Sequence, residues 1–417
     1  MTATETAATT AQGDRLPAWS VFAGVLSAAG LPIYLFAPAF YAETYGVSLT
    51  TLGLLLFGLR LFDLVQDPAL GWLTERLGRH RGRAIALGGL LLAMSMLGLF
   101  AVPPPVAPLL WFAITITGLF SAFSFLTIAF YAQGIAKADR IAGGHVRLAA
   151  WRESGALFGI CLAAVLPTML ALVTDAPQAA FAWGFVLATF CAVVLMRAEW
   201  TGNAAVAATP VRAILADRIT RRLLVLALVN AIPLAVSSTL FLFFVESRLD
   251  APGWEGPLLL LFFLSAAVSS SGWSALARRF GARPVLLAAM VLAILTFGWA
   301  LTLGSGDIVA FGVICVLSGA TIGADLTLLP AMFARRMAQV APNGGQGFGL
   351  WTFMNKVSLA LAAVTLLPLL ERAGFVAGQP APDAALTMLT LLYAGAPCAL
   401  KLLAIGLLAM TELEDEA

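Results

Sequence analysis

Two acidic residues, Asp63 and Asp67, lie inside the long apolar stretch 49–73, and Arg60 precedes them by about one helical turn. Charged side chains inside a helix of membrane-spanning length are costly unless they are paired, protonated or bound to a cation. The i, i+4 spacing places both carboxylates on one helix face, which Arg60 and Gly71 share. Two interpretations are open: a static intramembrane salt bridge to Arg60, or a cation site that faces a protein interior or a water-filled cavity.

The composition is that of a membrane protein. Of 417 residues, 61% are hydrophobic and 11% are charged, and the mean hydropathy is +0.94. A soluble globular protein carries roughly 25% charged residues. The basic residues lie in short loops, so the net charge of +2 does not point to nucleic acid, and we expect no nucleic-acid partner. The sequence contains no nucleotide-binding loop, no Ser/His/Asp arrangement and no metal-ligand spacing, so we expect neither an enzyme nor a cofactor.

Twelve apolar stretches are long enough to cross a bilayer, which takes about 20 residues each. They lie near 18–42, 48–73, 84–102, 108–134, 148–172, 179–197, 223–246, 255–277, 284–304, 308–333, 347–370 and 383–410. Lys and Arg gather in the loops that follow the even-numbered stretches. The positive-inside rule then predicts that both termini are cytoplasmic, with the chain in the cell inner membrane.

The longest polar stretch divides the chain near its middle, and each half carries a basic turn after its second apolar stretch. The first turn contains Glu75-Arg-Leu-Gly78 and the second contains Arg278-Arg-Phe-Gly281. We therefore predict an all-α polytopic fold of two pseudo-symmetric six-helix bundles, which resembles the major facilitator superfamily (MFS). The expected parts are a tail (1–17), a bundle (18–197), a connector (198–222), a second bundle (223–411) and an acidic tail (412–417).

Several motifs resemble more closely the glycoside–pentoside–hexuronide:cation symporters of that superfamily. The first motif is Arg60-x-x-Asp63-x-x-x-Asp67-Pro68-x-x-Gly71-Trp72. The others follow in order: Arg147-Leu-Ala-Ala-Trp-Arg152-Glu153, Gly319-Ala-Thr-Ile-Gly-Ala324 and Gly347-Phe-Gly-Leu-Trp351-x-x-x-Asn355-Lys356. The resemblance implies a secondary transporter that works by alternating access and couples a small organic solute, sugar-like or glycoside-like, to a cation. The expected partners are this solute and the lipid bilayer, and the expected state is a monomer.

The resemblance also implies roles for individual residues. In this family the acids of the second helix bind the coupling cation, Na⁺ or H⁺, which assigns Asp63 and Asp67 to that site. The matching positions add Gln66 and Ser124 as further oxygen ligands, and oxygen ligands suit a hard cation. Lys356 matches a family lysine that pairs with the acids when the cation is absent.

On the substrate side the resemblance is looser. Family members hold sugar hydroxyls with carboxylates on the first and fourth helices, where this chain has Ser27 and Thr127. A neutral hydroxyl lacks the charge-assisted hydrogen bond of a carboxylate, so a galactoside-type substrate is in doubt. The remaining substrate-side candidates are Arg152, Asp325 and Trp351.

The first basic turn resembles the superfamily's loop signature, which makes Glu75, Arg76 and Arg79 a candidate cytoplasmic gate loop. Other intramembrane charges admit simpler roles. We expect Glu153 to neutralise the adjacent Arg152. Asp325 either lines the cavity of the C-terminal half or pairs with Lys356.

Lys401, two turns from a helix end, is expected to extend to the membrane interface. Asn230 is expected to join two helices.

Two alternative functions keep the same fold. The loss of the sugar carboxylates, together with Phe241, Phe243, Phe244, Phe262 and Phe263, favours an amphiphile or lysolipid transporter. A non-transporting membrane sensor or chaperone would instead have both acids locked by Arg60 and Lys356.

Overall fold

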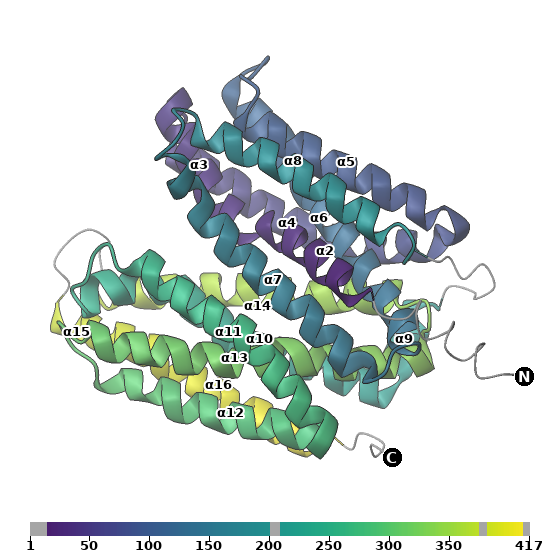
Figure 1. Cartoon of the computed structure of the whole chain (residues 1–417). Helices are drawn as coiled ribbons and strands as arrows, with labels where there is room; N and C mark the ends of the chain where they lie inside the picture. Colours follow the sequence, from purple (N-terminus) through teal and green to yellow (C-terminus); the bar gives the residue numbers. More distant parts are fainter. Residues whose placement is uncertain (1–14, 201–208, 375–381, 412–417) are drawn as a thin grey trace, which may run out of the picture. The chain divides into compact units, whose positions relative to one another are not determined.

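A computed structural model describes residues 15–200, 209–374 and 382–411 (Figure 1). Within these ranges the regular elements are all helices. The chain divides into two compact units. The first comprises Met1–Ala213 and Ala334–Leu350, and the second comprises Ile214–Phe333 and Trp351–Ala417. The segment 334–350, which the sequence analysis placed in the second bundle, thus packs with the helices of the first.

The first unit contains helices α2 to α8 and the first half of α9, whose residues from Ile214 on belong to the second unit. Their bounds are α2 Leu16–Ala28, α3 Leu31–Tyr45, α4 Leu49–Arg76, α5 Arg81–Phe100, α6 Pro108–Ala138, α7 Gly144–Leu170, α8 Pro177–Met196 and α9 Val211–Ala216. The first expected span is two helices rather than one, because the chain breaks at Gly30. Pro32 follows at the start of α3. Proline has no backbone N–H to donate, and in the interior of a helix its ring clashes with the carbonyl of the preceding turn.

Helices α2 and α7 pack through glycines. A Cβ added at Gly155 would lie 2.2 Å from the backbone oxygen of Ser20, and one added at Gly159 would lie 2.2 Å from that of Gly24. Small residues at such positions let helix backbones approach closely in a membrane, where apolar burial alone gives little drive to associate. Trp19 of α2 stacks on Phe130 of α6 at a centroid distance of 4.9 Å.

The second unit contains helices α10 to α16. Their bounds are α10 Arg218–Phe243, α11 Glu255–Phe280, α12 Ala282–Gly298, α13 Ile308–Val340, α14 Gly345–Arg372, α15 Asp383–Thr390 and α16 Ala396–Ala409, where the last residues of α13 and the first of α14 belong to the first unit. Short π-helical segments, Phe244–Arg248 and Leu391–Gly395, follow α10 and α15. The indole Nε1 of Trp273 on α11 donates to the backbone oxygen of Ala320 on α13 at 2.7 Å.

Ten helices in the described part of the chain are long and apolar enough to cross a membrane. In each of them 25–61% of the most apolar window is buried inside the structure, so much of the apolar surface is left to face lipid. Helix α4 has 28 residues and is therefore about 42 Å long. Helices α2 and α3 together correspond to the first expected span, 18–42. All twelve expected stretches therefore correspond to a helix or to a broken pair of helices.

Candidate functional site

Helix α4 carries the polar stripe that the sequence singled out. Asp67 is fully buried and Asp63 is 6% exposed, while Val65 between them is 75% exposed. The 3.6-residue period explains this difference, because positions 63 and 67 share a face that position 65 does not. Pro68 lies inside the helix directly after Asp67, where it removes one backbone hydrogen bond and favours a bend.

A chain of hydrogen bonds joins this stripe to α6. The amide Nε2 of Gln66 donates to Oδ1 of Asp63 at 2.8 Å, and the hydroxyl of Ser121 donates to Oε1 of Gln66 at 3.0 Å. Ser124, the expected ligand on α6, is buried one turn further along the same helix. Arg60 lies in α4, but its side chain is outside the described part of the structure. The structure thus brings Asp63 and Gln66 into contact and adds Ser121, which the sequence analysis missed.

These side chains form an oxygen-rich set inside a membrane-spanning helix pair. Carboxylate, amide and hydroxyl oxygens suit hard cations such as Na⁺. Gln66 presents its nitrogen to Asp63, so the amide stabilises the carboxylate as a cation would. Rotation of the amide by half a turn would present Oε1 to a cation instead.

The expected charge partner of the acids, Lys356, lies on α14 in the second unit and is half-buried. Its pairing with Asp63 or Asp67 stays a prediction. Directly before Lys356 in the chain, the side chain of Asn355 donates to the backbone oxygen of Trp351 at 3.0 Å. Trp351 itself is buried against Phe333, with ring centroids 4.8 Å apart.

Arg152 forms a compact cluster in the first unit. Its Nε donates to Oε1 of Glu153 at 2.9 Å, and the hydroxyl of Tyr131 donates to the same oxygen at 2.9 Å. The guanidinium also lies over the Tyr131 ring, 3.6 Å from its centroid. The adjacent acid therefore does neutralise Arg152, as expected. Of the two other substrate-side candidates in this unit, Ser27 is half-buried near the end of α2, and the hydroxyl of Thr127 is buried with no hydrogen-bond partner among the described residues.

The gate-loop candidates separate into different environments. Glu75 is buried and accepts from the backbone nitrogen of Gln346 at 2.8 Å and from its Nε2 at 3.2 Å. Arg76 is exposed and lies over the ring of Trp72, 3.9 Å from its centroid. The side chain of Arg79 is outside the described part.

The Glu75 contact belongs to a tightly packed region. A Cβ added at Gly71 would lie 2.6 Å from the backbone oxygen of Gly345. Nearby, Arg81 is buried and donates to Oε1 of Gln133 at 3.0 Å and to the Thr74 carbonyl at 3.4 Å. Arg81 was expected only among the basic loop residues, so its burial is a finding of the structure.

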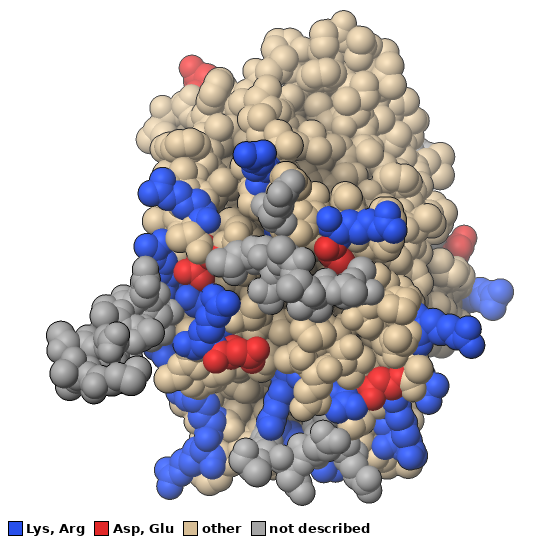
Figure 2. All heavy atoms as spheres, turned by 90° about the vertical axis from the view of Figure 1, so that its right-hand side faces the viewer, with Lys and Arg blue, Asp and Glu red and all other residues tan. Residues whose placement is uncertain are grey.

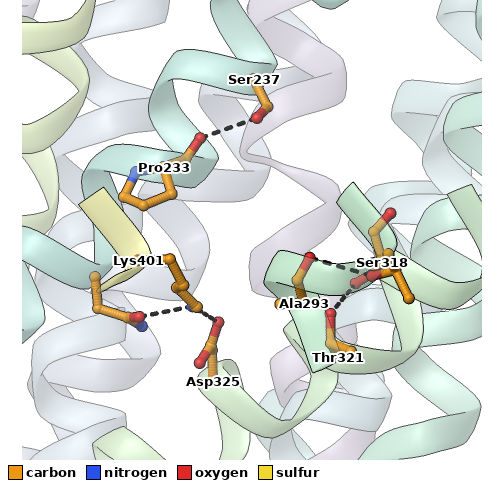
Figure 3. A network of polar contacts seen from close by, with 9 residues as sticks. Pro233, Ser237, Ala293, Ser318, Thr321, Asp325 and Lys401 are labelled. Atoms are coloured by element: carbon orange, nitrogen blue, oxygen red, sulfur yellow. Dashed lines mark hydrogen bonds and ion pairs between the residues drawn. The ribbon is translucent and has the colours of Figure 1, made fainter. Parts of the chain in front are cut away.

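In the second unit the structure corrects one expectation. Lys401 does not extend to the membrane interface; it is 5% exposed, and its ammonium donates to Oδ2 of Asp325 and to Oδ1 of Asn230, the latter at 2.7 Å (Figure 3). Asp325 therefore pairs with Lys401 on α16. Asn230 joins α10 to α16, as expected of an intramembrane amide. The physical reason is that an unpaired carboxylate inside the membrane is costly, and the ion pair with Lys401 lowers that cost.

Comparisons with known proteins agree with this architecture. A family model described as MFS/sugar transport protein matches residues 20–415. Comparison with curated proteins gives no significant match. A solved structure of a bacterial homologue of the iron transporter ferroportin, in the outward-facing state, is 16% identical with a TM-score of 0.71, and the match covers 94% of this chain and 98% of that one. An E. coli fucose:proton symporter is 14% identical with a TM-score of 0.64, and the match covers 93% and 98%. At these identities the likeness shows the fold alone, and it confirms the expected fold class.

Proposed function

On the premise that the chain belongs to the MFS/sugar transport protein family, we propose that it is a secondary transporter that couples a small organic solute to Na⁺ or H⁺. The family and the fold make it a transporter rather than an enzyme. The observation that carries the coupling proposal is the part-buried hydrogen-bonded chain Asp63–Gln66–Ser121, with the buried Asp67 one turn away. Such carboxylates inside a membrane span indicate an ion pathway or ion site.

The proposed coupling uses the amide of Gln66. Without a cation, its Nε2 holds Asp63 at 2.8 Å and its oxygen is held by Ser121. A cation takes the place of that donor, and Asp67 and Ser124 supply further oxygens. Lys356 acts as the charge partner of the acids when the cation has left, which would make return of the empty carrier depend on charge balance.

The proposed gate at the cytoplasmic side is the contact of Glu75 with Gln346. The segment that carries Gln346 is continuous with helices α13 and α14 of the second unit, and it packs on α4 of the first. Opening this side would require the two hydrogen bonds of Glu75 to break. Charge-assisted bonds of this kind are worth about 1.5–3 kcal/mol each, which is enough to bias a two-state transition without locking it.

We place the protein in the cell inner membrane with both termini cytoplasmic. Figure 2 looks onto the end of the molecule at which α9 lies in Figure 1, and it shows many Lys and Arg side chains there. Basic residues at one end of the helices support a cytoplasmic orientation of that end.

A sugar-like or glycoside-like solute is the proposed substrate class. The unpartnered hydroxyl of Thr127 supports it, because a buried hydroxyl without a partner gains a hydrogen bond when a polar ligand binds. The amphiphile alternative gains less from the structure. Of the phenylalanines that motivated it, Phe241, Phe262 and Phe263 line a cavity of about 50 Å³ in the second unit, about the volume of two water molecules.

Binding of radiolabelled sodium, with proton release recorded in parallel, tests the cation site in purified protein. We expect wild type to bind Na⁺ or to exchange a proton, and we expect Asp67→Asn to weaken this by at least about tenfold, which corresponds to 1.4 kcal/mol. The variant should fold, because it removes a costly buried charge. Asp175→Asn, at an exposed loop position of the same unit, is the matched control.

Counterflow in proteoliposomes against a library of sugars and glycosides, with and without Na⁺, tests the substrate class. If Asp67→Asn still concentrates a transported solute, the proposed coupling role of α4 is wrong. If no library member is exchanged by wild type while the cation binds, the sugar-like substrate class is wrong and the cation site stands.

A further inference from the structure

Three polar side chains that have no part in the proposed cation site meet inside the second unit. They come from three helices: Asn230 from α10, Asp325 from α13 and Lys401 from α16. Each is no more than 6% exposed. Lys401 has three N–H donors, and two of them are used by Asn230 and Asp325. The amide therefore keeps a hold on the ammonium that does not depend on the carboxylate.

The carboxylate of Asp325 is only half satisfied. Its Oδ2 contacts Lys401, but its Oδ1 is buried with no hydrogen-bond partner among the described residues. Asp325 and Lys401 both line a cavity of about 80 Å³. At about 30 Å³ for each water molecule, this cavity has room for two or three waters but not for a sugar.

Other polar atoms of the cavity wall are acceptors. The hydroxyls of Ser237, Ser318 and Thr321 line it, and each donates its proton to a backbone oxygen of its own helix, at 3.0, 2.6 and 2.8 Å (Figure 3). Each hydroxyl therefore offers only oxygen lone pairs to the cavity. A wall of acceptors favours a species that brings donors, such as water that carries an excess proton.

The charges at the cavity select among ligands. The titratable or charged residues in its lining are Asp325, Lys401 and Cys398; the lining residues from α10, α11 and α12 are neutral. A metal cation at Oδ1 would be opposed by the Lys401 ammonium, and an anion at the ammonium would be opposed by Oδ1. A proton needs no space of its own and arrives through water.

Each of the three helices has a proline near its polar residue. Pro233 lies three residues after Asn230, Pro330 lies five residues after Asp325, and Pro397 lies four residues before Lys401. Prolines remove backbone hydrogen bonds and mark the places where helices bend. A change of charge at this junction therefore acts on two helices, α10 and α13, whose backbone ladder a proline interrupts, and on α16 close to its start.

We propose that Asp325 is a proton-binding site, that the proton reaches Oδ1 through water in the cavity, and that Lys401, anchored by Asn230, is its counter-charge. One proton adds to the carboxylate, Lys401 keeps its three protons, and the charge of the pair rises from zero to plus one. The contact between Asp325 and Lys401 then loses its ionic character while that between Lys401 and Asn230 remains. This site is distinct from the α4 site and does not depend on its coupling role.

Infrared difference spectroscopy on the full-length protein in lipid vesicles tests the proposal, as buffer is exchanged between about pH 8 and about pH 5. We expect wild type to gain a protonated-carboxyl band, part of which disappears in Asp325→Asn. The double variant Asp325→Asn/Lys401→Met should lose the same part, and it removes both charges, which guards against a folding failure of the single variant. Asp307→Asn, an exposed acid of the same unit, should keep it.

Lys401→Met gives a second readout that a purely structural ion pair would not produce. Removal of the opposite charge at contact distance should change the intensity of the Asp325 part of the band relative to wild type at the same pH. Identical difference spectra for wild type, Asp325→Asn and the double variant would overturn the proposal and leave a permanent ion pair. Asp67→Asn should retain the Asp325 band. Failure of the α4 coupling proposal and failure of this one are therefore separable.

Discussion

Replacement of Lys401 by methionine should destabilise the second unit strongly. Methionine keeps the unbranched stem, so the main change is loss of the ammonium that contacts Asp325 and Asn230. Asp325 and Lys401 are each 5% exposed. Without the ammonium, the carboxylate of Asp325 would stay buried, lose its ionic partner and gain no other. Breaking a buried pair by removing one partner costs about 3–5 kcal/mol.

The double variant Asp325→Leu/Lys401→Met should cost much less. It replaces the pair by apolar side chains, and such replacement is often neutral because both desolvation penalties disappear together. The interaction term of the double-mutant cycle should therefore be at least about 3 kcal/mol, the size of one single-substitution loss. Additive effects of the two single substitutions would show that the two side chains do not interact, and would refute this reasoning.

Thermal unfolding in detergent, followed with a thiol-reactive dye, measures these effects. The buried thiol of Cys315 reports on the second unit, and the buried thiol of Cys161 reports on the first. For a unit of this size, 3–5 kcal/mol corresponds to a fall of about 6–20 °C in apparent unfolding temperature. In the variant, the thiol of Cys315 should become reactive at a lower temperature than the thiol of Cys161.

The pH dependence of that loss has a definite sign. In Lys401→Met the penalty comes from the charged carboxylate of Asp325, so it is fully present at high pH. As pH falls, protonation of the carboxyl removes it, at up to about 1.4 kcal/mol for each pH unit. The variant should therefore approach wild-type stability in acid, and a loss that stays constant with pH would contradict the explanation.

The helices could be predicted from the sequence because their signal is local. Each of the twelve apolar stretches of bilayer length coincides with a helix or a broken pair of helices, and the i, i+4 spacing of Asp63 and Asp67 placed both acids on one buried face of α4. The break between α2 and α3 had a signal too, in Gly30 followed by Pro32, but hydropathy averages across it. An apolar stretch of this length predicts that a segment crosses the membrane, but it does not predict whether the segment forms one helix or two.

The partners of the buried polar groups could not be predicted, because they depend on how each helix is rotated about its axis. Ser121 and Ser124 lie one turn apart on α6, and only the rotation of α6 against α4 decides which of them reaches Gln66. Likewise Asp325 required a cation, and the apolar stretches contain two lysines, Lys356 and Lys401. The choice of Lys401 follows from packing between residues 76 positions apart, which no local pattern contains.

Two further substitutions test the packing and the gate of the first unit. Gly155→Ala would place a Cβ 2.2 Å from a backbone oxygen of α2 and should lower the unfolding temperature reported by Cys161, whereas Gly184→Ala, with no atom within 4 Å of an added Cβ, should not. Glu75→Gln removes the charge from the two hydrogen bonds to Gln346, of 2.8 and 3.2 Å. A charge-assisted bond exceeds a neutral one by about 1 kcal/mol, so the segment 341–350 should exchange its backbone hydrogens about five- to thirtyfold faster. Mass spectrometry of the exchanged peptides measures this rate. An unchanged rate would mean that packing of the neighbouring glycines, and not Glu75, holds the segment against α4.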